Sequence, residues 1–270
     1  MSPQKRSILI IGGSGALGKP LTETFLRRKD RFGRIAILSE PEKAHKLDIA
    51  RALGAEFVFG SFLDAEIYHG FDIVFSLVGD PIMRLQPAMS EAAVKGGVRH
   101  FYPSEYGTDI SQEGIWSFRY LRDKVVTRDH LRATAKRVPG FKYTLVLVGL
   151  FTEYACSPFS GFDLDNHTVE VYGNADAGVV RYIVGSVFLL FPEGEYWREI
   201  RARGDHLPFT EAAKKQEKAR IRGDESGELM GAAKTAAATG KAFVPGPLDN
   251  DKFEFTPETA QETLSRLFSL

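Results

Sequence analysis

The chain has 270 residues, enough for one large domain or a main domain with a smaller partner, and it carries 35 basic and 35 acidic side chains. This charge balance gives no general attraction to nucleic acid or to anionic membranes, and a single cysteine, Cys156, excludes an intrachain disulfide. No apolar run approaches the roughly 18 residues of a membrane span, and the apolar stretch near the N-terminus is too short for a signal peptide, so we expect a cytoplasmic protein.

The first pattern is a strand, a glycine-rich turn and the start of a helix. Residues 7–11, Ser-Ile-Leu-Ile-Ile, lack polar alternation, as in a parallel strand that is buried on both faces, and a helical pattern covers residues 19–29. Between them, Gly12 would form the turn, Gly15 would let a pyrophosphate approach the backbone, and Gly18 would let the helix pack against the strand. The sequence therefore predicts a dinucleotide-binding turn with a phosphate at the helix N-terminus. The predicted turn also contains Ser14, Ala16 and Leu17.

Strand and helix patterns then alternate along the chain. Further strands are predicted at residues 34–38, 56–59, 72–78, 100–102 and 143–148. Helices are predicted at residues 41–53, 64–69, 81–95 and 115–138. This order predicts an α/β protein with a Rossmann-type, doubly wound parallel sheet, in which ligands bind outside the carboxyl ends of the strands.

The pattern becomes less regular after residue 150. Residues 195–228 are dense in charge, residues 231–240 are rich in alanine, and residues 257–270 return to an amphipathic helical pattern. We therefore expect residues 1–150 to form an NAD(P)-binding domain and residues 151–270 a smaller, partly irregular substrate-binding region.

Two residues on the helix after the fifth strand are candidates for proton transfer. Tyr120 and Lys124 are four residues apart, so they share one helix face, and an ammonium group beside a tyrosine lowers its pKa from about 10. Alternatively, Lys124 could bond the ribose of a nicotinamide or move the proton itself, or the two residues could be an exposed helix pair. Ser104 ends the fifth strand, where its hydroxyl could stabilise a substrate oxygen or cap the next turn.

Three segments carry a family resemblance in chain order: residues 12–18, residues 54–64, and Tyr102-Pro-Ser-Glu-Tyr-Gly-Thr-Asp109. They resemble the isoflavone reductase-like and NmrA-like family, an atypical branch of the short-chain dehydrogenase/reductase superfamily. The resemblance implies an NADP-binding Rossmann domain, a smaller C-terminal substrate domain and a general acid–base at Lys124. The resemblance implies one of two roles, because most enzymes of this family reduce aromatic metabolites, whereas NmrA-like members bind a dinucleotide and regulate partner proteins without catalysis.

The chain departs from the family in two places. Where the family usually has an arginine that binds the 2′-phosphate of NADP, this chain has Ser39 and Glu40, and Glu40 would repel a phosphate or accept bonds from a ribose diol. Lys43 remains as a phosphate partner, so NADP(H) is expected, with NAD(H) nearly as well matched. The C-terminal part is also short for the family, and the usual Asp-Ile-Gly segment is replaced by residues 182–185.

Four more residues complete the predicted cofactor site. Gly79 follows the fourth strand and leaves room for a ribose, Phe62 lies where the adenine of related folds rests, and Gly149 and Phe151 resemble the segment beside the nicotinamide. No histidine has metal-ligand spacing, so no metal is expected. The leading hypothesis is an NADP(H)-dependent reductase of a small aromatic or conjugated carbonyl-type metabolite. The alternative is an NmrA-like dinucleotide sensor that binds a protein partner, and the sequence leaves the oligomeric state open.

Overall fold

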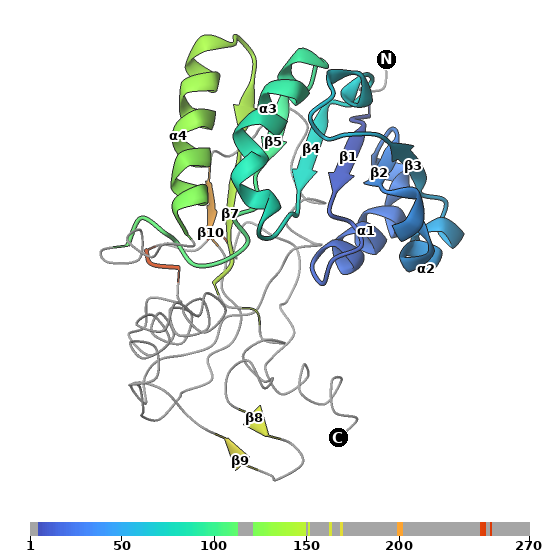
Figure 1. Cartoon of the computed structure of the whole chain (residues 1–270), viewed down its shortest axis with the longest axis horizontal. Helices are drawn as coiled ribbons and strands as arrows, with labels where there is room; N and C mark the ends of the chain where they lie inside the picture. The colour runs from blue at the N-terminus through green and yellow to red at the C-terminus, as the bar shows by residue number, and fades with distance from the viewer. Residues whose placement is uncertain are drawn as a thin grey trace. The chain divides into compact units, whose positions relative to one another are not determined.

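The main feature of the computed structural model is a six-stranded parallel sheet in the order β3-β2-β1-β4-β5-β6 (Figure 1). The strands are β1 (Ile8–Ile11), β2 (Ile35–Ser39), β3 (Glu56–Phe59), β4 (Ile73–Ser76), β5 (His100–Tyr102) and β6 (Lys142–Tyr143). The structure describes residues 5–112, 121–149, 151, 162–163, 168–169, 199–201, 244–246 and 249.

The centre of the sheet is β1, which pairs with β2 on one side and with β4 on the other. Ile8, Leu9 and Ile10 are all 0% exposed, because a central parallel strand is covered on both faces. The chain leaves β1 toward β2 and later returns to β4 on the other side of β1. This reversal of strand order marks the crevice in which doubly wound sheets bind ligands, and it confirms the predicted Rossmann-type fold.

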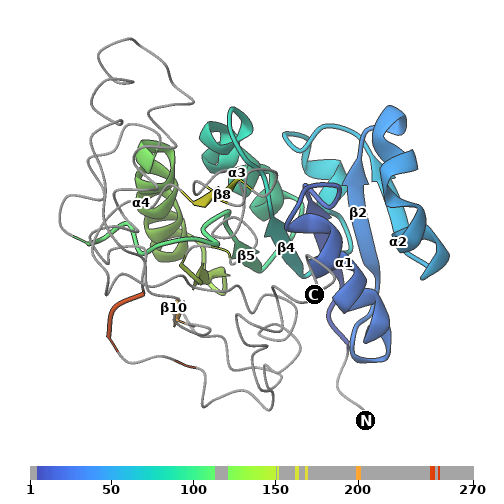
Figure 2. The same ribbon diagram turned by 90° about the horizontal axis from the view of Figure 1, so that it is seen from below.

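Helices pack along both halves of the sheet. The α-helices are α1 (Gly18–Arg27), α2 (Asp48–Ala52), α3 (Gln86–Lys95) and α4 (Arg122–Arg137), and the 3-10 helices are η1 (Lys29–Arg31), η2 (Pro41–Leu47), η3 (Ala65–Tyr68) and η4 (Ile82–Leu85). Helix α1 contacts α2, and α3 contacts η3 and η4. Figures 1 and 2 both show α3 and α4 side by side along β4 and β5.

Three predicted elements are divided in the structure. The helix predicted at residues 41–53 is η2 followed by α2, because Leu47 leaves helical geometry with φ −120° and ψ 27°. The helix predicted at residues 81–95 is η4 followed by α3, and Pro87 lies in the first turn of α3, where proline is well tolerated. The strand predicted at residues 143–148 is β6 followed by β7 (Leu145–Leu147).

The chain divides into two compact units. The first consists of Met1–Glu105, Asp123–Leu145 and Val184–Glu199, and the second of Tyr106–Arg122, Val146–Ile183 and Ile200–Leu270. Two small sheets pair β7 with β10 (Glu199–Arg201) and β8 (Phe162–Asp163) with β9 (Thr168–Val169). Cys156 and the helix predicted at residues 257–270 lie outside the described residues.

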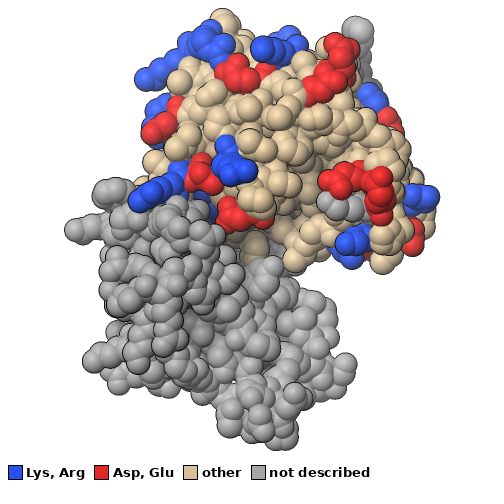
Figure 3. Space-filling view, in the orientation of Figure 1, with Lys and Arg blue, Asp and Glu red and all other residues tan. Residues whose placement is uncertain are grey.

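The described surface carries both signs of charge, and Figure 3 shows acidic and basic side chains interspersed over the face in view. Among the described helices, none combines the length and the apolar character that a membrane span needs.

An aromatic stack crosses the core of the first unit. Phe25 of α1 lies 5.0 Å from Phe75 of β4, Phe75 lies 4.4 Å from Tyr102 of β5, and Tyr102 lies 4.4 Å from His100, measured between ring centroids. His100 is 2% exposed, and its Nε2 lies 2.8 Å from the hydroxyl of Thr144. Burial, with a smaller contribution from Lys142, lowers the pKa of His100 to about 3.

His100 should therefore make the fold sensitive to acid. In the unfolded chain, His100 binds a proton as the pH falls below its ordinary pKa of 6.5, whereas in the folded chain it stays neutral down to about pH 3. The free energy of unfolding therefore falls as the pH falls from 6.5 to about 3. The contribution is at most about 1.4 kcal/mol per pH unit. Urea unfolding at several pH values should show a shallower decline for His100→Gln than for the wild type. Equal declines in the two proteins would contradict this assignment.

Candidate functional site

The turn between β1 and α1 depends on two glycines. Gly12 has φ +87°, and a Cβ at this position would lie 2.7 Å from the carbonyl oxygen of Leu77, at the end of β4. A Cβ at Gly18 would lie 2.1 Å from the carbonyl oxygen of Gly12. No side chain fits at either position, so the start of α1 lies directly against the turn. The predicted roles of Gly12 and Gly18 within the protein agree with this geometry.

The top of the turn presents unused hydrogen-bond donors. The N–H of Gly15 donates to Gly12 O at 3.0 Å, and the N–H of Lys19 donates to Gly15 O at 3.0 Å. Among the described residues, no group accepts from the N–H groups of Ala16, Leu17 or Gly18. Gly15 and Ala16 are exposed, Ser14 beside them is half-buried, and the first turn of α1 has no acidic side chain. This helix N-terminus can accept the negative charge of a phosphate group.

The residues after β2 border this turn. The hydroxyl of Ser39 donates to the carbonyl oxygen of Glu40 at 3.0 Å, and the Glu40 side chain is exposed. Lys43 lies in η2, and the position of its side chain is outside the described part of the structure. The geometry therefore provides a hydrogen-bonding serine and an acidic side chain at the end of β2, as the sequence predicts.

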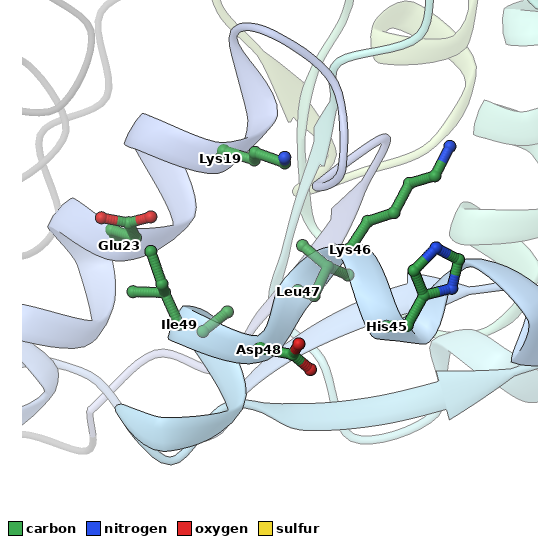
Figure 4. Close-up of a pocket in the computed structure, with 8 residues that line it drawn as sticks. Lys19, Glu23, His45, Lys46, Leu47, Asp48 and Ile49 are labelled. Carbon is green, nitrogen blue, oxygen red and sulfur yellow. The ribbon is translucent and has the colours of Figure 1, made fainter.

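A pocket of about 270 Å³ lies between α1 and the segment formed by η2 and α2 (Figure 4). Figure 4 shows that the amino groups of Lys19 and Lys46 extend to the same side of the view, away from Glu23. Sequence reasoning missed this pair, although Lys19 directly follows Gly18 and Lys46 comes three residues after Lys43. The pocket is lined by Lys19, Glu23, His45, Lys46, Leu47, Asp48, Ile49 and Ala50.

Phe62 and Gly79 lie after β3 and β4. The hydroxyl of Tyr68 donates to Phe62 O at 2.6 Å, which fixes the loop after β3, and burial raises the pKa of Tyr68. Gly79 is exposed, and a Cβ built there would meet no atom of the described residues within 4 Å. Open space therefore adjoins the carboxyl end of β4.

Ser104 links the carboxyl ends of β4 and β5. Its hydroxyl donates to Val78 O at 2.6 Å, and its backbone N–H donates to Oε1 of Gln86 at 2.7 Å. Ser104 is 9% exposed, and its hydroxyl proton is held by a backbone carbonyl. In this arrangement the hydroxyl oxygen can accept a hydrogen bond from another group, but it has no second proton to donate. Gln86, the first residue of α3, is a further contributor that the sequence did not indicate.

Lys124 is anchored to the segment that follows β5. Its Nζ donates to the backbone carbonyl oxygen of Glu105 at 2.5 Å. One helical turn later, Nε and Nη2 of Arg128 donate to the two carboxylate oxygens of Glu105 at 2.7 and 2.9 Å. The side chains of Arg128 and Glu105 are 10% and 1% exposed, so this bidentate pair is buried. Helix α4 thus binds Glu105 at two points.

The groups around Lys124 shift its pKa in opposite directions. Burial lowers its pKa most strongly, the carboxylates of Glu105 and Asp80 raise it, and the Arg128 guanidinium lowers it. Asp80, just after β4, has a raised pKa because of burial and the nearby Asp123 carboxylate, and Lys124 opposes this shift. The net result is a lysine whose pKa lies below its ordinary value. Such a group can exchange a proton near neutral pH more readily than an exposed lysine.

Three predicted site residues lie either outside the described residues or in the second compact unit. Tyr120 lies outside the described residues. Gly149 and Phe151 belong to the second compact unit, where Gly149 has φ +74° and its N–H donates to Gly107 O at 3.0 Å. Among the described residues, no group of three His, Cys, Asp or Glu side chains is arranged to hold a metal ion.

Comparison with known proteins gives one family and several relatives. The model of the NmrA-like family matches residues 4–174. An isoflavone reductase homolog from Solanum tuberosum is 30% identical over 160 residues, which are 56% of this chain and 51% of that protein. The chain thus spans about half the length of the curated relatives that it matches.

Solved structures share the fold at lower sequence identity. A crystal structure of isoflavone reductase matches with a TM-score of 0.76 and 18% identity, over 98% of this chain and 100% of that chain. An NADPH-dependent quinone oxidoreductase from Escherichia coli matches with a TM-score of 0.70 and 17% identity, over 97% of this chain and 99% of that chain. At these identities the likeness shows the fold alone.

The buried pair should be energetically coupled. Arg128→Met leaves the Glu105 carboxylate buried without its guanidinium partner, and Glu105→Gln removes the carboxylate from the guanidinium, so each should lower the free energy of unfolding by about 3–5 kcal/mol. The double variant removes both charges and should lose much less than the sum of the two single losses. Urea denaturation of all four proteins measures the coupling. Additive losses would show that the two side chains do not interact as described.

Proposed function

The chain belongs to the NmrA-like family, and on this premise we propose that it is an NADP(H)-dependent oxidoreductase that reduces a small aromatic or conjugated carbonyl-type metabolite. The observation that carries the proposal is the position of Lys124. The Glu105 carbonyl oxygen holds its amine at the carboxyl edge of the parallel sheet. The glycine turn after β1 lies at this same edge, because the carboxyl ends of parallel strands share one edge.

The glycine turn fits the pyrophosphate of a dinucleotide. The turn from Gly12 to Gly18 would hold it through backbone N–H groups, since Gly15 and Ala16 are exposed. Gly79 would leave room for a ribose, and Phe62 would border the adenosine half. When bound, the reduced nicotinamide supplies the hydride. The protein binds and orients this group, and Gly149 and Phe151 remain proposed neighbours of its nicotinamide half.

The preference for NADP(H) rests on local cations. Lys19 and Lys46 line the pocket between α1 and η2, and Lys43 lies in the same 3-10 helix, so up to three ammonium groups could bind a 2′-phosphate. Glu40 and Ser39 oppose this preference, because a carboxylate repels a phosphate and a serine makes weaker contacts than a guanidinium. We propose that the lysines prevail, with NAD(H) as a weaker ligand.

Lys124 would donate the proton that completes the reduction. A pKa below the ordinary value makes its ammonium group a stronger acid, and the hydrogen bond to Glu105 O holds the amine in a fixed direction. Tyr120 is proposed to share this proton transfer from four residues earlier in the chain. Ser104 would accept a hydrogen bond from the substrate, since its own proton is bound to Val78 O.

The proposed substrate class follows the relatives. Isoflavone reductase and a quinone oxidoreductase, by their names, act on aromatic or conjugated carbonyl compounds. Reduction of a group conjugated to an aromatic ring also needs one hydride and one proton, which a nicotinamide and a single proton donor supply. The substrate-binding region is proposed to come from residues 151–270.

Isothermal titration with NADPH, NADP, NADH and NAD tests the cofactor. We expect NADPH and NADP to bind more tightly than NADH and NAD. Gly79→Ala should leave stability unchanged, because its methyl group meets no protein atom, but should weaken NADPH binding about tenfold by occupying the ribose space. Gly18→Ala should lower both stability and affinity. If no dinucleotide binds more tightly than about 1 mM, the cofactor assignment fails.

Turnover of any accepted substrate tests Lys124. Lys124→Met should lower kcat by about 10²–10⁴-fold and leave NADPH affinity nearly unchanged, because it removes the proton donor and keeps the stem of the side chain. Lys136→Met, at an exposed position on the same helix, is the matched control and should retain activity. An unchanged kcat in Lys124→Met would remove Lys124 from the mechanism.

A second candidate is a dinucleotide-sensing regulator without catalysis. The acidic side chain of Glu40, at the end of β2, favours this candidate. Weak binding of the 2′-phosphate suits a reversible sensor better than an enzyme that must retain NADPH. A sensor would bind oxidised cofactor at least as well as reduced cofactor. The titration described above therefore separates the two candidates.

A further inference from the structure

We propose that the buried Glu105–Arg128 pair positions Lys124, so that Glu105 and Arg128 control the direction and the charge of the proton donor without touching the substrate. This inference rests on the proposed function of Lys124. Glu105 lies in the segment Tyr102–Asp109 that carries the family resemblance, but neither Glu105 nor Arg128 is among the predicted site residues.

The geometry makes Glu105 the support of Lys124. Glu105 is anchored three times: its N–H donates to Pro103 O at 2.8 Å, its carboxylate accepts two bonds from Arg128, and its carbonyl oxygen accepts the bond from Lys124. The first two anchors fix the peptide group that presents the carbonyl. The orientation of that carbonyl then fixes the Lys124 amine, because the contact between them is only 2.5 Å long.

The two residues that hold Glu105 come from a single helix face. Lys124 and Arg128 are four residues apart on α4, so they lie one above the other, and both reach the segment after β5. Rotation of the Lys124 side chain away from Glu105 O would have to break a bond whose acceptor cannot follow. The Lys124 side chain is a flexible four-carbon chain, and the pair therefore gives its amine a single preferred direction.

The charges of the pair also act on Lys124. The groups that face its ammonium are Glu105 from the segment after β5, Asp80 from the segment after β4, and Arg128 from its own helix, with Asp123 next to Asp80. Arg128 offsets the Glu105 carboxylate, which alone would favour the protonated lysine. Asp80 and Asp123 stay in place when the pair is changed, so variants of the pair isolate its effect.

A purely structural role would leave Lys124 unaffected. A buried ion pair adds little stability compared with apolar groups of the same volume, so stability alone gives a weak reason for this pair. A positioning role predicts instead that changes at Glu105 and at Arg128 move the titration of Lys124 in opposite directions. The sign of each shift follows from which charge remains.

The test is lysine ¹³Cε NMR of the full chain without cofactor, with Lys124→Met identifying the resonance. Arg128→Met leaves the Glu105 carboxylate uncompensated, so the pKa of Lys124 should rise. Glu105→Gln removes a carboxylate that favours the protonated lysine and keeps the Arg128 guanidinium, so the pKa of Lys124 should fall. Arg132→Met is the matched control, because Arg132 forms an exposed pair with Asp129 one turn further along α4, and it should shift nothing.

A variant with both changes, Glu105→Gln and Arg128→Met, covers the case in which a single variant does not fold. Its charges cancel, so the pKa of Lys124 should stay near that of the wild type, whereas kcat should fall about 10²-fold because the carbonyl is no longer pinned. The single variant Arg128→Lys keeps the positive charge, so its kcat should lie between that of the double variant and that of the wild type. Identical Lys124 titrations in the wild type and in every folded single variant would overturn the proposal, as would a double variant with full kcat.

These outcomes are separate from failure of the proposed function. If Lys124→Met retained full turnover, Lys124 would not be the proton donor, and the proposed function would fail on that measurement. The NMR titrations need no substrate and would still show whether the pair controls the lysine.

Discussion

The close approach of α1 to the turn after β1 is the constraint on which this half of the protein depends. The helix begins where the carbonyl of Gly12 lies, at a distance that permits no side chain on Gly18, and the same turn presses against the end of β4 through Gly12. Three elements therefore meet without side chains between them. Their union places helix N–H groups at the point where the strand order reverses, and every other part of the candidate site is arranged around that point.

The carboxyl edge of the sheet carries two kinds of chemistry in separate places. The end of β1 offers backbone donors, which suit a phosphate, whereas the ends of β4 and β5 offer Ser104 and Lys124, which suit the exchange of protons. Ser104 and Glu105 are adjacent in sequence but serve different partners, since the first holds the loop after β4 and the second holds α4. The segment after β5 thus contacts both the loop after β4 and helix α4. Lys124, which this segment holds by a hydrogen bond, has a pKa below its ordinary value.

The fold was predictable because its signals are local. The apolar residues 8–11 and 73–75 mark the strands predicted at 7–11 and 72–78 as covered on both faces, and the glycine spacing marks the turn. Lys124 was predicted as a site residue from an equally local signal, as one member of a pair four residues apart. The Glu105–Arg128 pair was not, because a salt bridge across 23 residues of sequence depends on how a helix docks against a strand end. The split between η2 and α2 also escaped prediction, since one backbone angle at Leu47 decides it.

The spacing of Lys124 and Arg128 has a consequence for how this segment can vary. Both residues reach Glu105 because one helical turn separates them, and each residue added or removed between them would rotate one about 100° away from the other. Val126, which lies between them, is 56% exposed and can change in residue type, whereas Thr127 is 1% exposed and its hydroxyl donates to Asp123 O. An insertion or a deletion in this segment would separate the amine from its support.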